Sequence, residues 1–261
     1  MKKFSRLLIF CCFINIQLNA QIVLDSSIAV KDFTVDMLGQ CYAISGSEII
    51  KLDATGNIIS TYSKKDLGNP TSLDARDPLR LLVFYRDFGM IRILDNQLAE
   101  QSQLDLRQLG FSDVRLIAGN DDQSIWIYDR ANAQLSKLDV RLQKSLLTVN
   151  IRQFLGKAIF PRKLEVSRSW IVLQNEKEQI LLDQYGTYSR TIPLNYIPIL
   201  FQLDGHQLLT GNSDSVEITD LNLFDSTKKI DMILPFEAQK AVIFKDKIWY
   251  LKGDKLFLPK D

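Results

Sequence analysis

Histidine and cysteine are scarce in this chain. The 261 residues include one histidine, His206, and three cysteines, two of which are Cys11 and Cys12 near the start. Beyond residue 20 only Cys41 remains, so an internal disulfide there is excluded. Zinc sites built from several Cys and His ligands at short spacings are excluded as well. We therefore expect no metal centre of that type and no cofactor.

An excess of positive charge is also missing. Lysine and arginine together number 32 against 31 acidic residues, which gives a net charge of +1, and the basic residues are scattered along the chain. Proteins that bind nucleic acid need a concentrated positive field to exploit the phosphate charges. The sequence therefore predicts no nucleic-acid partner.

Only one apolar stretch stands out, and it lies at the start. Basic residues at positions 2, 3 and 6 precede the apolar run Leu7–Ile16, and Ala20 precedes Gln21. A basic start, a short apolar centre and a small residue before the break are typical of a cleavable secretory signal. The run is too short to cross a bilayer. We predict a signal peptide over residues 1–20 and a mature chain that does not span the membrane.

Two other interpretations of this segment stay open. The first is a retained membrane anchor. The second is a lipidated Cys11 or Cys12, which is disfavoured because Phe10 stands where a small residue is expected and the preceding apolar run is short. With cleavage, the protein is expected to be exported, as a periplasmic or outer-membrane-associated protein.

A strand–turn–strand pattern ending in Asp recurs along the rest of the chain. Examples are "CYAISGSEIIKLD" from Cys41 and "IWIYDRANAQLSKLD" from Ile125. The terminal aspartates are Asp53, Asp95, Asp139, Asp183 and Asp220, with spacings of 42, 44, 44 and 37 residues. A period of about 40 residues with four short strands per repeat is the signature of propeller blades. Because an Asp side chain can bond nearby backbone groups in a turn, we assign these aspartates to the scaffold.

Further strands fit between the repeats, at 57–63, 71–75, 115–119, 162–167 and 198–205. Helical periodicity over ten or more residues is absent, and the nearest candidate, 104–111, is too short. The alternative is a two-sheet sandwich, which would not require a 40-residue period. We predict an all-β, six-bladed β-propeller over residues 21–261, with blades at 33–69, 70–113, 114–159, 160–197, 198–234, and 235–261 plus 21–31.

The two ends of the mature chain complement each other. The sixth repeat offers only three strands, "AVIFKD", "KIWYLK" and "KLFLPK", whereas "QIVLDSSIAV" precedes the first repeat without a blade of its own. An N-terminal strand that completes the last blade would remove an open sheet edge. We therefore predict that residues 21–30 pair with the strand around 255–258.

With this repeat pattern the sequence resembles six-bladed propellers of the broad NHL-repeat type, and particularly compact single-domain propellers exported into Gram-negative envelopes. The resemblance covers nearly all of the mature chain and is architectural. The Asn-His-Leu signature, the Tyr-Trp-Thr-Asp blade motif and the Trp-Asp dipeptide are all missing. No functional residue of a family can be carried over, and a shared fold does not establish function.

The candidate catalytic residues are few. His206 lies in a turn before a strand, where a surface position is more common than a catalytic one, and Cys41 lies on an apolar strand. The first strands of the blades are expected to bring Asp36, Asp74 and Glu165 toward the central channel. Oxygen ligands of this kind could hold a divalent cation, as in a metal-dependent lactonase or esterase. We favour acids that are hydrogen-bonded to the backbone around a wet channel.

Aromatic and arginine side chains gather at two successive turns. The residues are Tyr85, Arg86, Asp87 and Phe88 in one repeat, and Tyr128, Asp129 and Arg130 in the next. Aromatic residues and Arg are enriched at protein interfaces. In the alternative interpretation Phe88 folds back onto its own hairpin. We predict a non-enzymatic platform that binds a protein partner of a cell-envelope assembly through these turns. The alternative is a hydrolase or small-ligand binder that uses the channel mouth.

Overall fold

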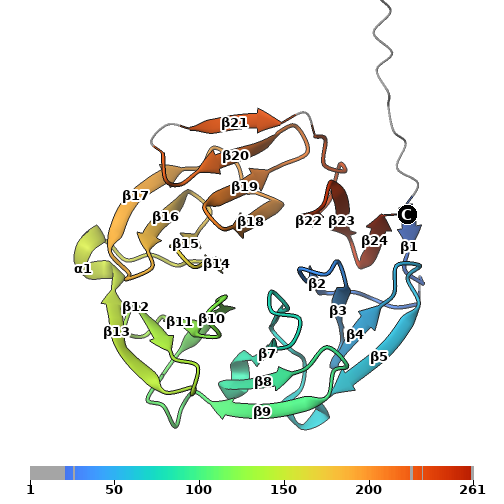
Figure 1. Cartoon of the computed structure of the whole chain (residues 1–261), viewed down its shortest axis with the longest axis horizontal. Coiled ribbons are helices and arrows are strands. Elements are labelled where there is room, and N and C mark those ends of the chain that lie inside the picture. The colour runs from blue at the N-terminus through green and yellow to red at the C-terminus, as the bar shows by residue number, and fades with distance from the viewer. Residues whose placement is uncertain (1–20, 26, 224–225, 231, 260–261) are drawn as a thin grey trace, which may run out of the picture.

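The computed structural model describes residues 21–259 except 26, 224–225 and 231. The predicted signal peptide at 1–20 lies outside the described residues. The strands are arranged in a ring around a common centre, where the channel was predicted, with the first strand of each repeat innermost and the fourth at the rim (Figure 1). The predicted all-β propeller fold is confirmed.

Four sheets have four antiparallel strands each, in chain order from the centre outward. The first contains β2 (Asp32–Val35), β3 (Cys41–Ser45), β4 (Glu48–Leu52) and β5 (Ile58–Ser63). The second contains β6 (Ser72–Asp74), β7 (Leu81–Tyr85), β8 (Met90–Leu94) and β9 (Glu100–Asp105). The third contains β10 (Val114–Gly119), β11 (Ile125–Asp129), β12 (Gln134–Leu138) and β13 (Lys144–Asn150). The fourth contains β14 (Lys163–Val166), β15 (Trp170–Gln174), β16 (Glu178–Asp183) and β17 (Tyr188–Pro193).

The last seven strands and β1 form one continuous eight-stranded sheet, so the prediction of six separate blades is wrong as a count. Its strands are β18 (Leu200–Asp204), β19 (Gln207–Gly211), β20 (Val216–Asp220), β21 (Thr227–Ile230), β22 (Lys240–Phe244), β23 (Lys247–Lys252), β24 (Lys255–Pro259) and β1 (Gln21–Val23). The physical reason is a parallel bridge between the two innermost strands. Leu200 pairs with Ala241 there, and the Ala241 N–H donates to the Ile199 carbonyl at 2.8 Å.

The predicted closure of the ring is confirmed. β1 pairs antiparallel with β24, and Val23 lies opposite Phe257. The contact continues past the strand, because the Leu24 N–H donates to the Leu256 carbonyl at 3.0 Å and the Val30 N–H donates to the Asp254 carbonyl at 2.8 Å. Residues from the two ends of the chain therefore share one sheet.

Apolar side chains between neighbouring sheets form the core. Tyr42 and Ile49 of the first sheet share a buried cluster with Leu81 and Val83 of the second. Because each sheet is covered on both faces, all five residues of β7 are buried, with no alternation. The rim strand β5 is instead largely exposed.

The repeated aspartates hold the turns between the third and fourth strands. One carboxylate oxygen of Asp53 accepts hydrogen bonds from the backbone N–H groups of Thr55, at 2.9 Å, and Asn57, at 2.8 Å. Asp95, Asp139 and Asp183 make the same pair of contacts. Hydrogen bonds from Thr55 and Asn57 lower the pKa of Asp53 to about 2. These bonds favour the ionised carboxylate and support a scaffold role.

The alternation of strand direction gives the disc two distinct faces. Turns between first and second strands, and between third and fourth strands, lie on one face, which we call the turn face. Turns between second and third strands lie on the other face with the links between successive repeats, at 64–71, 106–113, 151–162, 194–199 and 232–239. We call it the connection face. It carries the short helix α1 (Ile151–Leu155) and the 3-10 turns η1 (Lys65–Leu67) and η2 (Arg86–Phe88).

Candidate functional site

The two turns predicted to bind a partner both lie on the connection face. Arg86, Asp87 and Phe88 form η2 and are exposed, and 43% of the Phe88 surface is accessible. Arg130 is exposed in the β11–β12 turn of the next sheet. The contacts with these turns are local: the Arg107 guanidinium donates to the Asp87 carbonyl at 2.7 Å, and Arg130 pairs with Asp113 at 2.6 Å.

The other three residues of that prediction are buried and cannot contact a partner directly. Tyr85 is 1% exposed, and the buried Tyr128 hydroxyl donates to the Ile159 carbonyl at 3.1 Å. The Asp129 carboxylate accepts from the backbone N–H groups of Ser112, at 3.2 Å, and Asp113, at 3.0 Å. Asp129 thus fixes the link between the second and third sheets. Of the residues predicted to bind a partner, only Arg86, Asp87, Phe88 and Arg130 are exposed.

Further exposed apolar side chains, not found from the sequence, lie on the same face. Four side chains on three successive links are strongly exposed: Phe160 at 67%, Ile197 at 60%, Ile233 at 81% and Phe236 at 75%. We call these four residues the apolar sector. Phe160 and Ile197 each directly precede a buried proline, Pro161 and Pro198. Because a proline restricts the residue before it to extended conformations, each link keeps its shape while the preceding side chain faces solvent.

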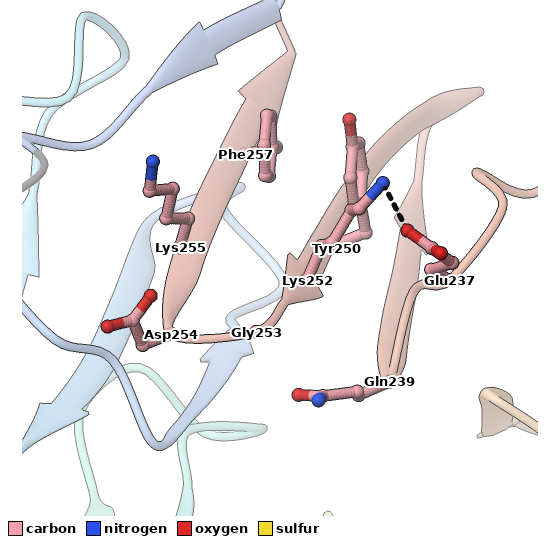
Figure 2. Close-up of a pocket in the computed structure, with 8 residues that line it drawn as sticks. All are labelled: Glu237, Gln239, Tyr250, Lys252, Gly253, Asp254, Lys255 and Phe257. Carbon is pink, nitrogen blue, oxygen red and sulfur yellow. Dashed lines mark ion pairs between the residues drawn. The ribbon is translucent and has the colours of Figure 1, made fainter.

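An open hollow of about 650 Å³ lies in the last sheet, with Glu237 and Gln239 of the 232–239 link among its lining residues (Figure 2). Its wall contains the rings of Tyr250 and Phe257, which stack with centroids 4.5 Å apart and planes 4° apart. The Lys252 ammonium and the Glu237 carboxylate form an ion pair across the rim at 2.8 Å. The hollow thus combines an aromatic wall with a charged rim, and this combination is common in protein interfaces.

The carboxylates predicted for the channel have different surroundings. The Asp74 oxygens accept from the backbone N–H groups of Arg76, at 2.9 Å, and Gly119, at 2.8 Å. Glu165 pairs with the Arg76 guanidinium at 2.6 Å, which joins the second and fourth sheets across the channel. Burial raises the pKa of Glu165, and the charge of Arg76 opposes that rise.

Asp36 is buried at the β2–β3 turn instead of joining that group. Its carboxylate accepts from the backbone N–H groups of Leu38, at 2.9 Å, and Gln40, at 2.8 Å, and from the Tyr42 hydroxyl at 3.2 Å. All three contacts lie within one hairpin. Asp36 therefore stabilises its own turn.

The remaining candidates for chemistry are isolated. Burial raises the pKa of the Cys41 thiol, which keeps it protonated and unreactive at neutral pH. His206 is exposed, with its imidazole 3.7 Å from the Asp220 carboxylate. Within the described ranges, no three His, Cys, Asp or Glu side chains gather as a metal site would require. The helices there are also too short or too polar for a membrane span.

Comparison with known proteins identifies the fold. No protein-family model matches the chain, and no curated protein does. A streptogramin B lyase structure is 13% identical over 90% of this chain and 80% of that one, with a TM-score of 0.63. The WD40 domain of Neurospora crassa Pan2 is 10% identical, with coverage of 87% and 74% and a TM-score of 0.60.

A virginiamycin B lyase from Staphylococcus aureus is 11% identical, with coverage of 87% and 79% and a TM-score of 0.59. At such identities the likeness shows a β-propeller fold and nothing finer. These propellers include both lyases and a WD40 domain, so the fold does not decide between catalysis and binding.

Proposed function

We propose that this protein is a non-enzymatic interaction platform whose connection face binds a protein partner. The apolar sector carries the proposal, because four large apolar side chains lie 60–81% exposed on three successive links of one face. Large exposed apolar patches on soluble proteins mark interaction surfaces. The Tyr250–Phe257 hollow adds a concave site, which Glu237 and Gln239 of the 232–239 link help to line.

The turns at Arg86–Phe88 and Arg130 extend the proposed surface around the same face. Arg and aromatic side chains of this kind act as anchors at interfaces, where a few residues supply most of the binding free energy. Arg130 and Arg107 are already held by Asp113 and the Asp87 carbonyl. Such preorganisation reduces the entropy lost when a partner binds.

We further infer that the partner belongs to a cell-envelope assembly, periplasmic or associated with the outer membrane. This inference depends on the basic and apolar pattern of residues 1–20, which is typical of a cleaved secretory signal. We also infer that the eight-stranded sheet acts as two blades, since its halves meet through one bridge pair, Leu200–Ala241.

Co-purification of the tagged protein from mild-detergent extracts of its own cells tests the platform. The double variant Ile233→Ser and Phe236→Ser should lose the partner retained by the wild type, because it removes two central anchors. A second variant, Phe88→Ala with Arg130→Ala, should weaken retention. The matched control is Tyr185→Ser, which removes a 66% exposed aromatic from the turn face.

All three variants should melt as the wild type does, because exposed side chains contribute little to stability. Loss of the partner in the Tyr185→Ser control, with retention in the Ile233→Ser and Phe236→Ser variant, would contradict the proposal. That outcome would place binding on the turn face.

A further inference from the structure

A second cavity, of about 380 Å³, opens on the turn face at the channel mouth. Four sheets contribute to its wall: Met37 comes from the β2–β3 turn, Leu82 from β7, Asp121 from the β10–β11 turn and Arg168 from the β14–β15 turn. The volume lies near the lower end of the range for small-molecule sites. The cavity is thus sized for a small ligand and lies on the face opposite the apolar sector.

The acidic side chains of the cavity differ in how many hydrogen bonds they already accept. Both Asp74 oxygens accept backbone N–H groups, and the Asp77 carboxylate accepts from the Leu79 N–H at 2.9 Å. The Asp121 carboxylate accepts no hydrogen bond from any residue that the structure describes, although it is close enough to Arg76 to raise the pKa of that guanidinium. Of the three carboxylates in this wall, Asp121 is the one with both oxygens available to a ligand.

The three arginines of the wall also differ in whether they already form hydrogen bonds or ion pairs. Arg76 is bound to Glu165 through one terminal nitrogen, and its other terminal nitrogen is buried without a hydrogen-bond partner in the described chain. Arg80 donates to the Gln123 carbonyl. Arg168 is exposed and forms neither an ion pair nor a hydrogen bond with the described residues. Its planar guanidinium is suited to bidentate binding of a carboxylate.

We propose that this cavity binds a small zwitterion, an amino acid with an apolar side chain. Its carboxylate would bind Arg168, its ammonium group would bind Asp121, and its side chain would lie against Met37 and Leu82. The wall carries three arginines and three aspartates, so it is formally neutral. An inorganic anion would leave the Asp121 carboxylate without a partner, and a simple cation would leave Arg168 without one. A zwitterion satisfies both.

Isothermal titration calorimetry with the purified mature protein tests the site, with L-leucine as the probe. L-leucine should bind, whereas N-acetyl-L-leucine, which lacks the ammonium group, and L-leucinamide, which lacks the carboxylate, should each bind at least about tenfold more weakly. The zwitterion could be a free amino acid or a short peptide. Leucyl-glycine distinguishes the two, because its ammonium and carboxylate groups are farther apart than those of leucine. Tighter binding of leucyl-glycine than of leucine would assign the site to short peptides instead of free amino acids.

Two variants test whether L-leucine binds in this cavity. Arg168→Ala and Asp121→Asn should each weaken L-leucine binding by about tenfold or more, since each removes one charged hydrogen-bonding partner. Arg141→Ala is the matched control, because it removes an exposed arginine of the same face outside the cavity. All three variants alter exposed side chains and should melt normally. Absence of L-leucine binding at millimolar concentration, or equal binding of N-acetyl-L-leucine, would overturn the proposal.

Discussion

Lys163 of β14 shows how one half-buried charged group affects stability near the centre of the ring. Its ammonium group lies over the Phe201 ring, 5.7 Å from the centroid, and contacts the Pro198 carbonyl at 3.4 Å. The pKa of Lys163 is lowered to about 8, mainly by burial and in part by the positive charge of Lys240, while Glu165 and Asp32 oppose the change. Protonation of Lys163 is therefore less favourable in the folded state than in the unfolded chain.

This shift predicts a pH dependence of stability. In the unfolded chain a lysine has a pKa of about 10.4, so between pH 8 and 10 the unfolded state binds more protons than the folded state. The free energy of unfolding should therefore rise with pH in that window. Lys163→Met should be more stable than the wild type at pH 7 and should lack this rise. Urea unfolding at pH 7, 8 and 9 measures both effects, and identical pH profiles would refute the assignment.

Single residues also show where sequence patterns mislead. Tyr85, Tyr128 and Asp129 stand at a polar break, which favoured exposure, yet β7 and β11 are buried throughout because both faces of each sheet are covered. A strand without alternation gives no sign of which end faces solvent. Exposure at these turns begins one residue after the strand, at Arg86 and Arg130.

Among the elements, the strands were the most predictable part of the structure. The strands expected at 57–63, 115–119 and 162–167 correspond to β5, β10 and β14. Each is a local apolar pattern bounded by polar turns, and these signals are contained within a few residues. The bridge between β18 and β22 is not local, because it depends on how closely two sheets approach at the channel. No pattern along the chain reports that distance.

The cavity at the channel mouth was hidden from the sequence for the same reason. Arg76, Asp121 and Arg168 are separated by 45 and 47 residues, and each stands in a polar loop that resembles any other. Only the ring brings their loops to one cavity. The apolar sector left a weak local signal, an apolar residue before a proline at Phe160 and Ile197. Polar residues and an apolar residue before a proline are both common in loops that bind nothing.

The pairing of β1 with β24 predicts that removal of the N-terminal strand lowers thermal stability. Removal of residues 21–30 exposes the edge of β24 and removes Leu24, which is 3% exposed, from the cluster between the last and first sheets. The thermal midpoint should fall by several degrees, because burial of one leucine side chain is worth about 2–5 kcal/mol in Leu→Ala substitutions. Leu24→Ala in the full mature chain should show a smaller decrease. Equal midpoints for all three proteins would contradict a stabilising role for this strand.

At the scale of the whole molecule, the two faces of the disc carry different candidate sites. The connection face carries the apolar sector, and the turn face carries the charged cavity at the channel mouth together with exposed apolar side chains of its own, such as Leu79 and Tyr185. Because the core lies between neighbouring sheets around the whole ring, side chains on either face can change without loss of packing. A protein partner on one face and a small ligand on the other could then bind at the same time.

Site-specific photocrosslinking in intact cells gives the most direct test of the connection face as the partner-binding surface. A photoreactive amino acid is placed singly at Ile197, Phe236 or Tyr185, which are all exposed. We predict that positions 197 and 236 crosslink to the same envelope protein, whereas position 185 on the turn face does not. Crosslinks to that protein from position 185 alone would contradict a partner on the connection face.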